Sequence, residues 1–167
     1  LMWSPPLDNG GSPITNYNIY RGTSSGGETL LTTVGNVLTY TDTNVTNGQT
    51  YYYQISAVNS IGEGPLSEEV SATPIGVPSE PQNLQVSAGD GEVVLTWSPP
   101  LDNGGSPITN YNIYRGTSSG GETLLTTVGN VLTYTDTNVT NGQTYYYQVS
   151  AVNIVGEGPK SNEVSAT

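Results

Sequence analysis

The sequence predicts an all-β protein made of two tandem β-sandwiches, and one repeated stretch carries most of that prediction. Residues 143–153 read QTYYYQVSAVN, and the stretch returns almost unchanged at residues 49–59. Tyr145, Tyr147, Val149 and Ala151 fall on one side of it at a period of two, as in a strand with one buried face. No segment of the chain has the periodicity of an amphipathic helix.

The residues before this strand indicate that two sheets pack face to face. Val139 and an Asn-Gly turn precede Tyr145, so the Tyr145 hydroxyl can bond the backbone that the chain has just passed. This arrangement is a tyrosine corner, which is typical of two-sheet sandwiches. Tyr51 occupies the same place in the earlier copy. Both tyrosines are therefore expected to have a structural role.

The chain contains an internal repeat, because residues 1–73 return as residues 95–167. The two copies differ only at Met2/Thr96, Ile55/Val149, Ser60/Ile154, Ile61/Val155, Leu66/Lys160 and Glu68/Asn162. So close a repeat predicts a module that is used in several copies in a row. We assign residues 1–73 to a first module, residues 74–80 to a linker and residues 81–167 to a second module.

Seven strands are expected in the second module, which is complete. They lie at residues 81–88, 92–97, 108–115, 122–129, 133–139, 143–153 and 160–167. Outside the 143–153 strand, the side chains expected to face the core are Leu84, Val86, Val93, Leu95, Trp97, Tyr111, Ile113, Tyr134, Val164 and Ala166. Turn residues separate the strands, and Pro99 and Pro100 end the second one because proline offers no N–H to a neighbouring strand.

The first module lacks its N-terminal strand and most of its second strand, because Leu1 is the counterpart of Leu95. We expect this gap to leave an unpaired strand edge and to expose an inner face formed by Tyr17, Ile19, Tyr51 and Tyr53. Uncovering roughly 300 Å² of apolar surface costs about 7 kcal/mol, comparable with the whole stability of a small domain. The missing strands would come from residues before Leu1 or from another chain by donor-strand addition.

The linker is rich in proline. Residues 73–81 read TPIGVPSEP. Proline restricts its own backbone and biases the preceding residue toward extended geometry. The linker is therefore expected to be a semi-rigid spacer that advances about 3 Å per residue, which would make an array of modules elongated.

The composition excludes several classes of partner. Three Lys and Arg residues stand against 14 Asp and Glu residues, which gives a net charge of −11. Nucleic acid is excluded because basic side chains hold phosphate backbones, and insertion into a membrane is excluded because no apolar run is long enough. Charged residues make up only 10% of the chain, as in many exported surface proteins. We expect an extracellular or cell-surface location.

The sequence predicts neither an enzyme nor a cofactor. Histidine and cysteine are absent, so no nucleophile–histidine arrangement can form. A site made of carboxylates alone would use Asp102 and Asp136, but both are better explained as residues that bond nearby backbone N–H groups. No loop has the alternating acidic spacing of a calcium site. No metal site is predicted, although Glu80 and Glu157 are candidates for a junctional one.

Two further sets of residues are candidate sites. Asn44 and Asn138 each begin an N-x-T sequon, which accepts a glycan if the protein is exported through a suitable system. Outward-facing tyrosines should form cross-strand pairs that stack on sugars, contact a neighbouring module or only stabilise the sheet. These tyrosines are Tyr20, Tyr52, Tyr114 and Tyr146.

The second module resembles a fibronectin type III domain, in the YRG form typical of microbial extracellular proteins. The matching residues are Trp97, Pro99, Pro100, Ile108, Thr109, Tyr111, Val139, Tyr145, Ala151, Val152 and Asn153. The resemblance implies two tandem immunoglobulin-like sandwiches. The integrin-binding RGD tripeptide of the family has no match, because the last loop reads NIVGEGPKSN and Arg115-Gly116-Thr117 lies at another corner.

These observations favour a non-enzymatic spacer or assembly module of a repetitive surface or secreted protein. Its partners would be neighbouring copies of the module or other surface proteins. Two alternatives stay open. In the first, the chain would be an accessory module of a polysaccharide-acting enzyme, with polysaccharide as its ligand. In the second, it would be a filament subunit that is completed by strands from a neighbouring chain. The substitutions gather around the last loop, where contacts with neighbours should be sought.

Overall fold

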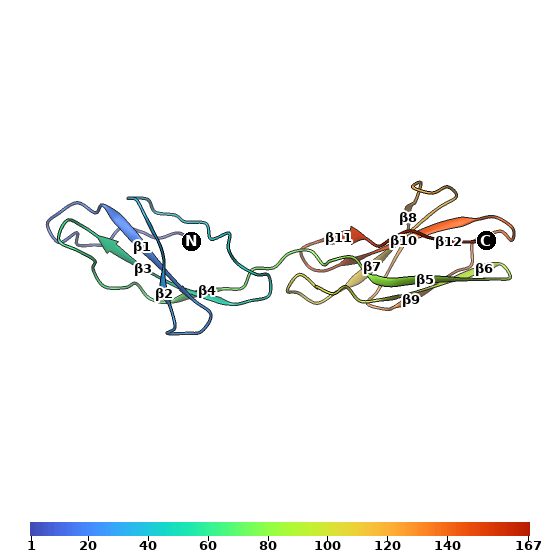
Figure 1. Ribbon diagram of the computed structural model, residues 1–167, viewed down its shortest axis with the longest axis horizontal. Coiled ribbons are helices and arrows are strands. Elements are labelled where there is room, and N and C mark those ends of the chain that lie inside the picture. The colour runs from blue at the N-terminus through green and yellow to red at the C-terminus, as the bar shows by residue number, and fades with distance from the viewer. The chain divides into compact units, whose positions relative to one another are not determined.

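The computed structural model describes residues 1–167 and divides them into two compact units, Leu1–Pro74 and Ile75–Thr167. Both units are built from antiparallel strands (Figure 1). The all-β prediction is therefore confirmed. The structure has no helix that is long and apolar enough to cross a membrane.

The second unit is a sandwich of two sheets. One sheet has the order β5-β6-β9, and the other has the order β11-β10-β7-β8 with β12 also paired to β10. The strands are β5 (Gln82–Gly89), β6 (Glu92–Ser98), β7 (Asn110–Gly116), β8 (Thr123–Val128), β9 (Thr133–Asp136), β10 (Tyr145–Val152), β11 (Glu157–Lys160) and β12 (Val164–Ala166).

The core of the second unit lies between these sheets. Its buried side chains are Leu84, Val93, Leu95, Trp97, Tyr111, Ile113, Tyr145, Tyr147, Val149 and Ala151. Val86, Tyr134, Val164 and Ala166 are partly buried and pack against this cluster. The alternation of apolar residues therefore identified the inner faces of both sheets correctly.

The last predicted strand is interrupted in the structure, where only Lys160, the last residue of β11, and β12 fall within its bounds. Residues 160–167 were expected to be continuous, but β11 and β12 are separated at residues 161–163. Ser161 causes the break, because its hydroxyl accepts the N–H of Val149 at 3.0 Å while its own N–H bonds the carbonyl of Val149 at 2.8 Å. A side chain thus replaces one rung of the backbone ladder.

The first unit retains one complete sheet with the order β2-β1-β3-β4. Its strands are β1 (Asn16–Gly22), β2 (Thr29–Val34), β3 (Tyr51–Val58) and β4 (Val70–Ala72). The second layer is reduced to a bridge between Met2 and Thr39. The N–H groups of Tyr40 and Trp3 bond the carbonyls of Leu1 and Leu38 at 3.0 and 3.1 Å.

The expected exposure of the inner face in the first unit is wrong. Tyr17, Ile19, Tyr51 and Tyr53 are all buried. The short remaining segment of the second layer is enough to cover them, because Trp3 packs against Tyr17 with ring centroids 5.4 Å apart. Further cover comes from Leu1, Leu31, Val34, Tyr40, Val45 and Ile55.

The two units differ locally, at one end of β3. Val149 and Ala151 are fully buried in the second unit, whereas their counterparts Ile55 and Ala57 are only partly buried. Ser161 is also buried, but its counterpart Ser67 is exposed. The first unit is therefore open beside the end of β3.

Candidate functional site

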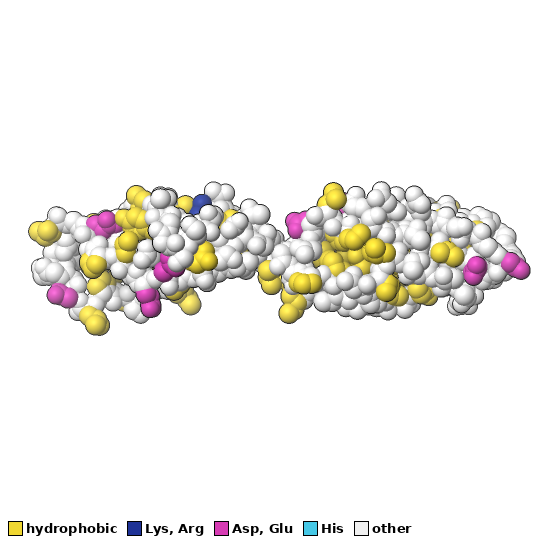
Figure 2. All heavy atoms as spheres, turned by 90° about the horizontal axis from the view of Figure 1, so that it is seen from below, with side chains coloured by type: hydrophobic (Ala, Val, Ile, Leu, Met, Phe, Trp, Pro, Cys, Tyr) yellow, Lys and Arg dark blue, Asp and Glu magenta, His cyan; other side chains and the backbone are white.

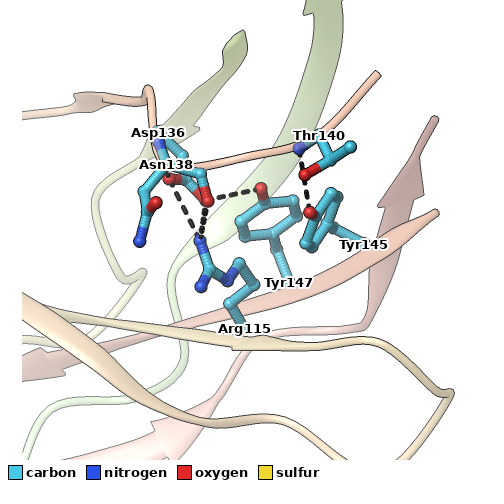
Figure 3. Close-up of polar contacts among 6 residues, drawn as sticks. All are labelled: Arg115, Asp136, Asn138, Thr140, Tyr145 and Tyr147. Atoms are coloured by element: carbon cyan, nitrogen blue, oxygen red, sulfur yellow. Dashed lines mark hydrogen bonds and ion pairs between the residues drawn. The ribbon is translucent and has the colours of Figure 1, made fainter. Parts of the chain in front are cut away.

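A buried ion pair lies between β7 and the end of β9 in the second unit (Figure 3). The guanidinium of Arg115 contacts Asp136 at 2.9 Å, and only 1% of the Asp136 side chain is exposed. The Tyr147 hydroxyl donates to the same carboxylate at 2.7 Å, and the N–H of Asn138 donates to it at 3.1 Å. The charge of Asp136 is thus fully engaged within the fold.

The tyrosine corner lies next to this ion pair. The Tyr145 hydroxyl accepts the N–H of Thr140 at 2.9 Å (Figure 3). In the first unit the Tyr51 hydroxyl accepts the N–H of Thr46 at 2.8 Å. The guanidinium of Arg115 lies over the Tyr145 ring at 5.3 Å, a favourable cation–π arrangement. The corner and the ion pair therefore fix the crossover between the two sheets.

The same cluster occurs in the first unit, where it is more open. Arg21 contacts Asp42 at 2.9 Å, and Tyr53 donates to Asp42 at 2.7 Å. Burial alone would raise the pKa of Asp42, but hydrogen bonds from Tyr53, Arg21 and the Asn44 N–H together hold it below its usual value. Burial, followed by the hydrogen bond to Asp42, raises the pKa of Tyr53. Both groups keep their ordinary charges near neutral pH.

Asp102 and Asp136, the acids that carboxylate catalysis would need, lie in separate structural roles. Asp102 accepts the N–H of Gly104 at 2.8 Å in a turn, whereas Asp136 belongs to the buried ion pair. In neither unit do three or more Asp or Glu side chains gather to hold a metal. Glu80 is exposed, and Glu157 lies in a polar cluster on the outer face of the sheet.

That cluster surrounds Tyr114 and was not found from the sequence. Glu157 accepts hydrogen bonds from Asn112 at 2.8 Å, from Ser150 at 2.5 Å and from the Tyr114 hydroxyl. The amine of Lys160 lies 4.1 Å from the centre of the Tyr114 ring. In the first unit Tyr20 bonds Glu63 in the same way, but Leu66 replaces the lysine.

The four outward tyrosines lie on neighbouring strands. Tyr114 is opposite Gln148 and Tyr146 is opposite Gly116, so these two tyrosines are diagonal neighbours on one face. Tyr20 and Tyr52 have the same relation in the first unit. The Tyr114 hydroxyl is held by Glu157 and its ring by Lys160, so a ligand would meet a tyrosine whose position is already set.

Asn44 and Asn138 are exposed. Asn138 lies just after β9, at the start of the crossover to β10, and Asn44 is its counterpart in the first unit. Their backbone carbonyls accept hydrogen bonds from Arg21 and Arg115 at 3.0 Å. Both side-chain amides are without a hydrogen-bond partner in the chain. The face of the chain drawn in Figure 2 is mostly uncharged, with scattered acidic side chains and few basic ones. The sequons are thus accessible to modification.

The open end of β3 in the first unit forms a groove of about 650 Å³. It is lined by the segment after Trp3, by the end of β3 and by the loop at residues 61–67. Apolar lining comes from Trp3, Pro6, Ile14, Ile55, Pro65 and Leu66. The second unit has no comparable groove, because residues 75–81 fill the equivalent place, with Pro78 and Pro81 fully buried.

The two modules share one internal plan and a tyrosine corner, and these features define a class of modular β-sandwich proteins. The chain belongs to the fibronectin type III family, because the family model described as Fibronectin type III domain matches residues 1–73 and 79–167. The resemblance seen in the sequence is therefore confirmed.

Relatives of this chain carry very different names. A Kelch domain-containing protein of Sulfurisphaera tokodaii is 39% identical over 129 residues, covering 77% of this chain and 17% of that protein. Exoglucanase B of Cellulomonas fimi is 34% identical over 166 residues, covering 93% of this chain and 14% of that protein. Titin of Drosophila melanogaster is 32% identical and covers 95% of this chain and 1% of titin. The chain thus spans less than a fifth of each.

Solved structures agree on the fold. Titin kinase with its flanking domains is 28% identical with a TM-score of 0.50, covering 55% of this chain and 17% of that one. A crystal structure of titin domains is 21% identical with a TM-score of 0.56, covering 89% of this chain and 53% of that one. The second likeness shows the fold alone.

Proposed function

We propose that this chain is a structural spacer of a repetitive extracellular or cell-surface protein, without catalytic activity of its own. The near-exact duplication of a module whose charged groups are used by its own fold carries this proposal. The carboxylate of Asp136 pairs with Arg115, and that of Glu157 accepts a hydrogen bond from Asn112. None of these charged groups points into an open cleft. What such a module offers to a larger protein is length and resistance to unfolding.

Pulling the whole chain by its two ends in optical tweezers tests the spacer function. A sandwich unfolds cooperatively, so we expect the second module to stay closed until one step releases roughly 300 Å of extended chain. The Asp136→Asn chain should open at a lower force because its ion pair is lost. Gradual lengthening without a discrete step would contradict the spacer function.

A second candidate function is that of an accessory module in a polysaccharide-acting enzyme. The similarity to Exoglucanase B, whose name denotes action on a glucan, favours it. The outward pair Tyr114 and Tyr146 would stack on sugar rings, since aromatic faces pack against the apolar faces of sugars. The hydrogen bond to Glu157 that holds the Tyr114 hydroxyl in place supports this use.

Sedimentation with insoluble cellulose tests the accessory function. The unmodified chain should sediment with the polymer, and the chain with Tyr114→Ala and Tyr146→Ala should stay in solution. A chain with Tyr134→Phe is the control, because Tyr134 lies on the inner side of the other sheet. If the double variant sediments as well as the unmodified chain, these tyrosines do not bind the polymer.

The proposed location outside the cell makes Asn44 and Asn138 glycan acceptors. Their exposure and their free amides support this role. Expression through a eukaryotic secretory pathway should give a chain whose mass falls on enzymatic deglycosylation, and Asn44→Gln with Asn138→Gln should remove that change. An unchanged mass for the unmodified chain would contradict the assignment.

A further inference from the structure

The loop between β7 and β8 is held by one carboxylate from a distant part of the chain. Glu163, just before β12, accepts the hydroxyl of Ser119 at 2.6 Å with one oxygen and the N–H of Gly120 at 2.8 Å with the other. β12 pairs with β10, and β8 pairs with β7. The two hydrogen bonds therefore connect segments that lie on opposite sides of the two central strands.

A second carboxyl group lies against the first. Glu122, at the end of the same loop, has one carboxyl oxygen that is buried and has no hydrogen-bond partner, and its carboxyl group lies within hydrogen-bonding range of Glu163. Two ionised carboxylates cannot bond each other, and a buried oxygen without a donor is costly. One proton shared by the two groups removes both problems, because a protonated carboxyl group donates and an ionised one accepts.

No basic side chain neutralises this pair. The chain has no histidine, and in the second module Arg115 pairs with Asp136 while Lys160 lies over a tyrosine ring. Glu163 faces a single ionisable group, which is Glu122. A proton is therefore the one positive charge available to hold these two carboxyl groups together.

The pKa values of the two groups move apart, as expected for a pair that shares a proton. Burial, followed by the hydrogen bond to Glu163, raises the pKa of Glu122. The hydrogen bond from Glu122, followed by those from Ser119 and the Gly120 N–H, lowers the pKa of Glu163. Such a pair binds its first proton at a higher pH than an isolated glutamate does.

The first module repeats this arrangement. Glu69 accepts the hydroxyl of Ser25 at 2.6 Å and the N–H of Gly26 at 2.8 Å, and Glu28 has a buried carboxyl oxygen without a partner. The hydrogen bond to Glu69, followed by burial, raises the pKa of Glu28. All of these residues belong to the duplicated sequence, so the arrangement is a property of the module.

We propose that Glu122 and Glu163 form a proton-dependent clasp on the β7–β8 loop, closed by one proton that the two carboxyl groups share. Glu28 and Glu69 form the same clasp in the first module. When the proton leaves, both groups of a pair are charged and repel each other, and the loop is released. The clasp does not depend on whether the chain is a spacer.

Two opposite contributions set the pH range in which the clasp is closed. Glu122, with its raised pKa, stabilises the closed form below its unfolded pKa of about 4.3, and this contribution is lost as the pH rises through the raised value. Glu163, with its lowered pKa, contributes above about pH 4.3, and this contribution is lost as the pH falls through the lowered value. The loop is therefore held most firmly in mildly acidic solution and is released toward neutral pH.

Hydrogen exchange of the Gly120 N–H, followed by NMR on the full ¹⁵N-labelled chain, tests the clasp. This N–H donates to Glu163, so its protection factor, which corrects for the intrinsic effect of pH on exchange, reports whether the clasp is closed. We expect the protection factor to fall by roughly tenfold between pH 5 and pH 7.5, the factor that corresponds to a shift of one pKa unit. A constant protection factor over this range would overturn the proposal.

Matched variants in the two modules identify the proton. Glu122→Gln supplies an amide that donates to Glu163 at every pH, so Gly120 should stay protected up to pH 7.5. Glu28→Gln should have this effect at Gly26 and leave the pH dependence at Gly120 unchanged, which makes each variant the control for the other. If Gly120 in the Glu122→Gln chain keeps the pH dependence of the unmodified chain, the shared proton is not what closes the clasp and the proposal is overturned.

Discussion

At the scale of the residue, Asp136 is the charged side chain with the most hydrogen bonds in the second module. It receives hydrogen bonds from Arg115, from Tyr147 and from the Asn138 backbone while almost none of it is exposed. A buried carboxylate is tolerated only when its charge is compensated in this way. The cluster therefore ties β7, β9 and β10 to one point.

Asp136→Asn should lower the free energy of unfolding of the second module by about 3 kcal/mol, because Arg115 would lose its buried partner. Asp42→Asn should cost less, since 6% of the Asp42 side chain is exposed against 1% for Asp136. Urea denaturation followed by tryptophan fluorescence measures both. Glu92→Gln, at an exposed position of β6 without a bonded partner, is the control. Equal losses at Asp136 and Glu92 would contradict the role of the ion pair.

The polar cluster on the outer face predicts a dependence on pH. Partial burial alone would raise the pKa of Glu157, but hydrogen bonds from Asn112, Ser150 and Tyr114 and the nearby Lys160 hold it below its usual value. A carboxyl group with a lowered pKa in the folded state stabilises the fold above its unfolded pKa of about 4.3, and this contribution disappears as the pH falls through the lowered pKa.

Thermal unfolding of the unmodified and Glu157→Gln chains from pH 7 to pH 2.5 measures this contribution. We expect the unmodified chain to be the more stable one above about pH 4.5, and the difference to vanish toward the acid end. Tyr114→Phe should reduce the difference, because it removes one of the hydrogen bonds. A difference that stays constant across this range would show that ionisation of Glu157 is not involved.

At the scale of the element, β10 could be predicted almost completely, but the break between β11 and β12 could not. Period-two alternation placed Tyr145, Tyr147 and Val149 in the core, because successive side chains of a strand point to opposite faces, so a buried face appears as a local pattern in the sequence. The break after β11 depends on Ser161, whose hydroxyl replaces a backbone partner of Val149. A single hydroxyl that bonds across strands leaves no periodic signal.

Gly158→Ala should destabilise the second module by about 1–3 kcal/mol, because the added methyl group would overlap the carbonyl of Pro78. The same change at Gly64 in the first module should fall within roughly 0.5 kcal/mol of zero, since its surroundings are open. Urea unfolding of the two variants side by side measures the contrast. Equal destabilisation would mean that the segment before β5 does not rest on Gly158.

At the scale of the whole molecule, the two modules are almost identical in sequence but differ in how much apolar surface they bury. Leu84, Val86 and Val93 contribute to the core of the second module and have no counterpart in residues 1–73. The unpaired edge of the first module could be predicted from the repeat. The burial of its tyrosines could not, because it depends on how the short segment around Trp3 packs against Tyr17.

The chain should therefore unfold in two steps, with the first module opening at lower urea than the second. Met2 is the single methionine of the chain, so the NMR signal of its ¹³C-labelled methyl group follows the unfolding of the first module. Fluorescence follows the two tryptophans together. Leu84→Ala should lower only the free energy of unfolding of the second module, by about 2–5 kcal/mol. A single transition seen at the same urea concentration by both probes, and moved as a whole by Leu84→Ala, would contradict independent modules.

The ion pairs also bear on digestion by proteases that cut after basic side chains. Arg21 and Arg115 lie within β1 and β7 and are held by aspartates, while Lys160 is followed by the buried Ser161. Such a protease needs an extended loop around the scissile bond, which neither arginine offers while the sheets are intact. Cleavage after Arg21 or Arg115 then requires local opening first, so the rate at which trypsin cuts there reports how often these sheets open.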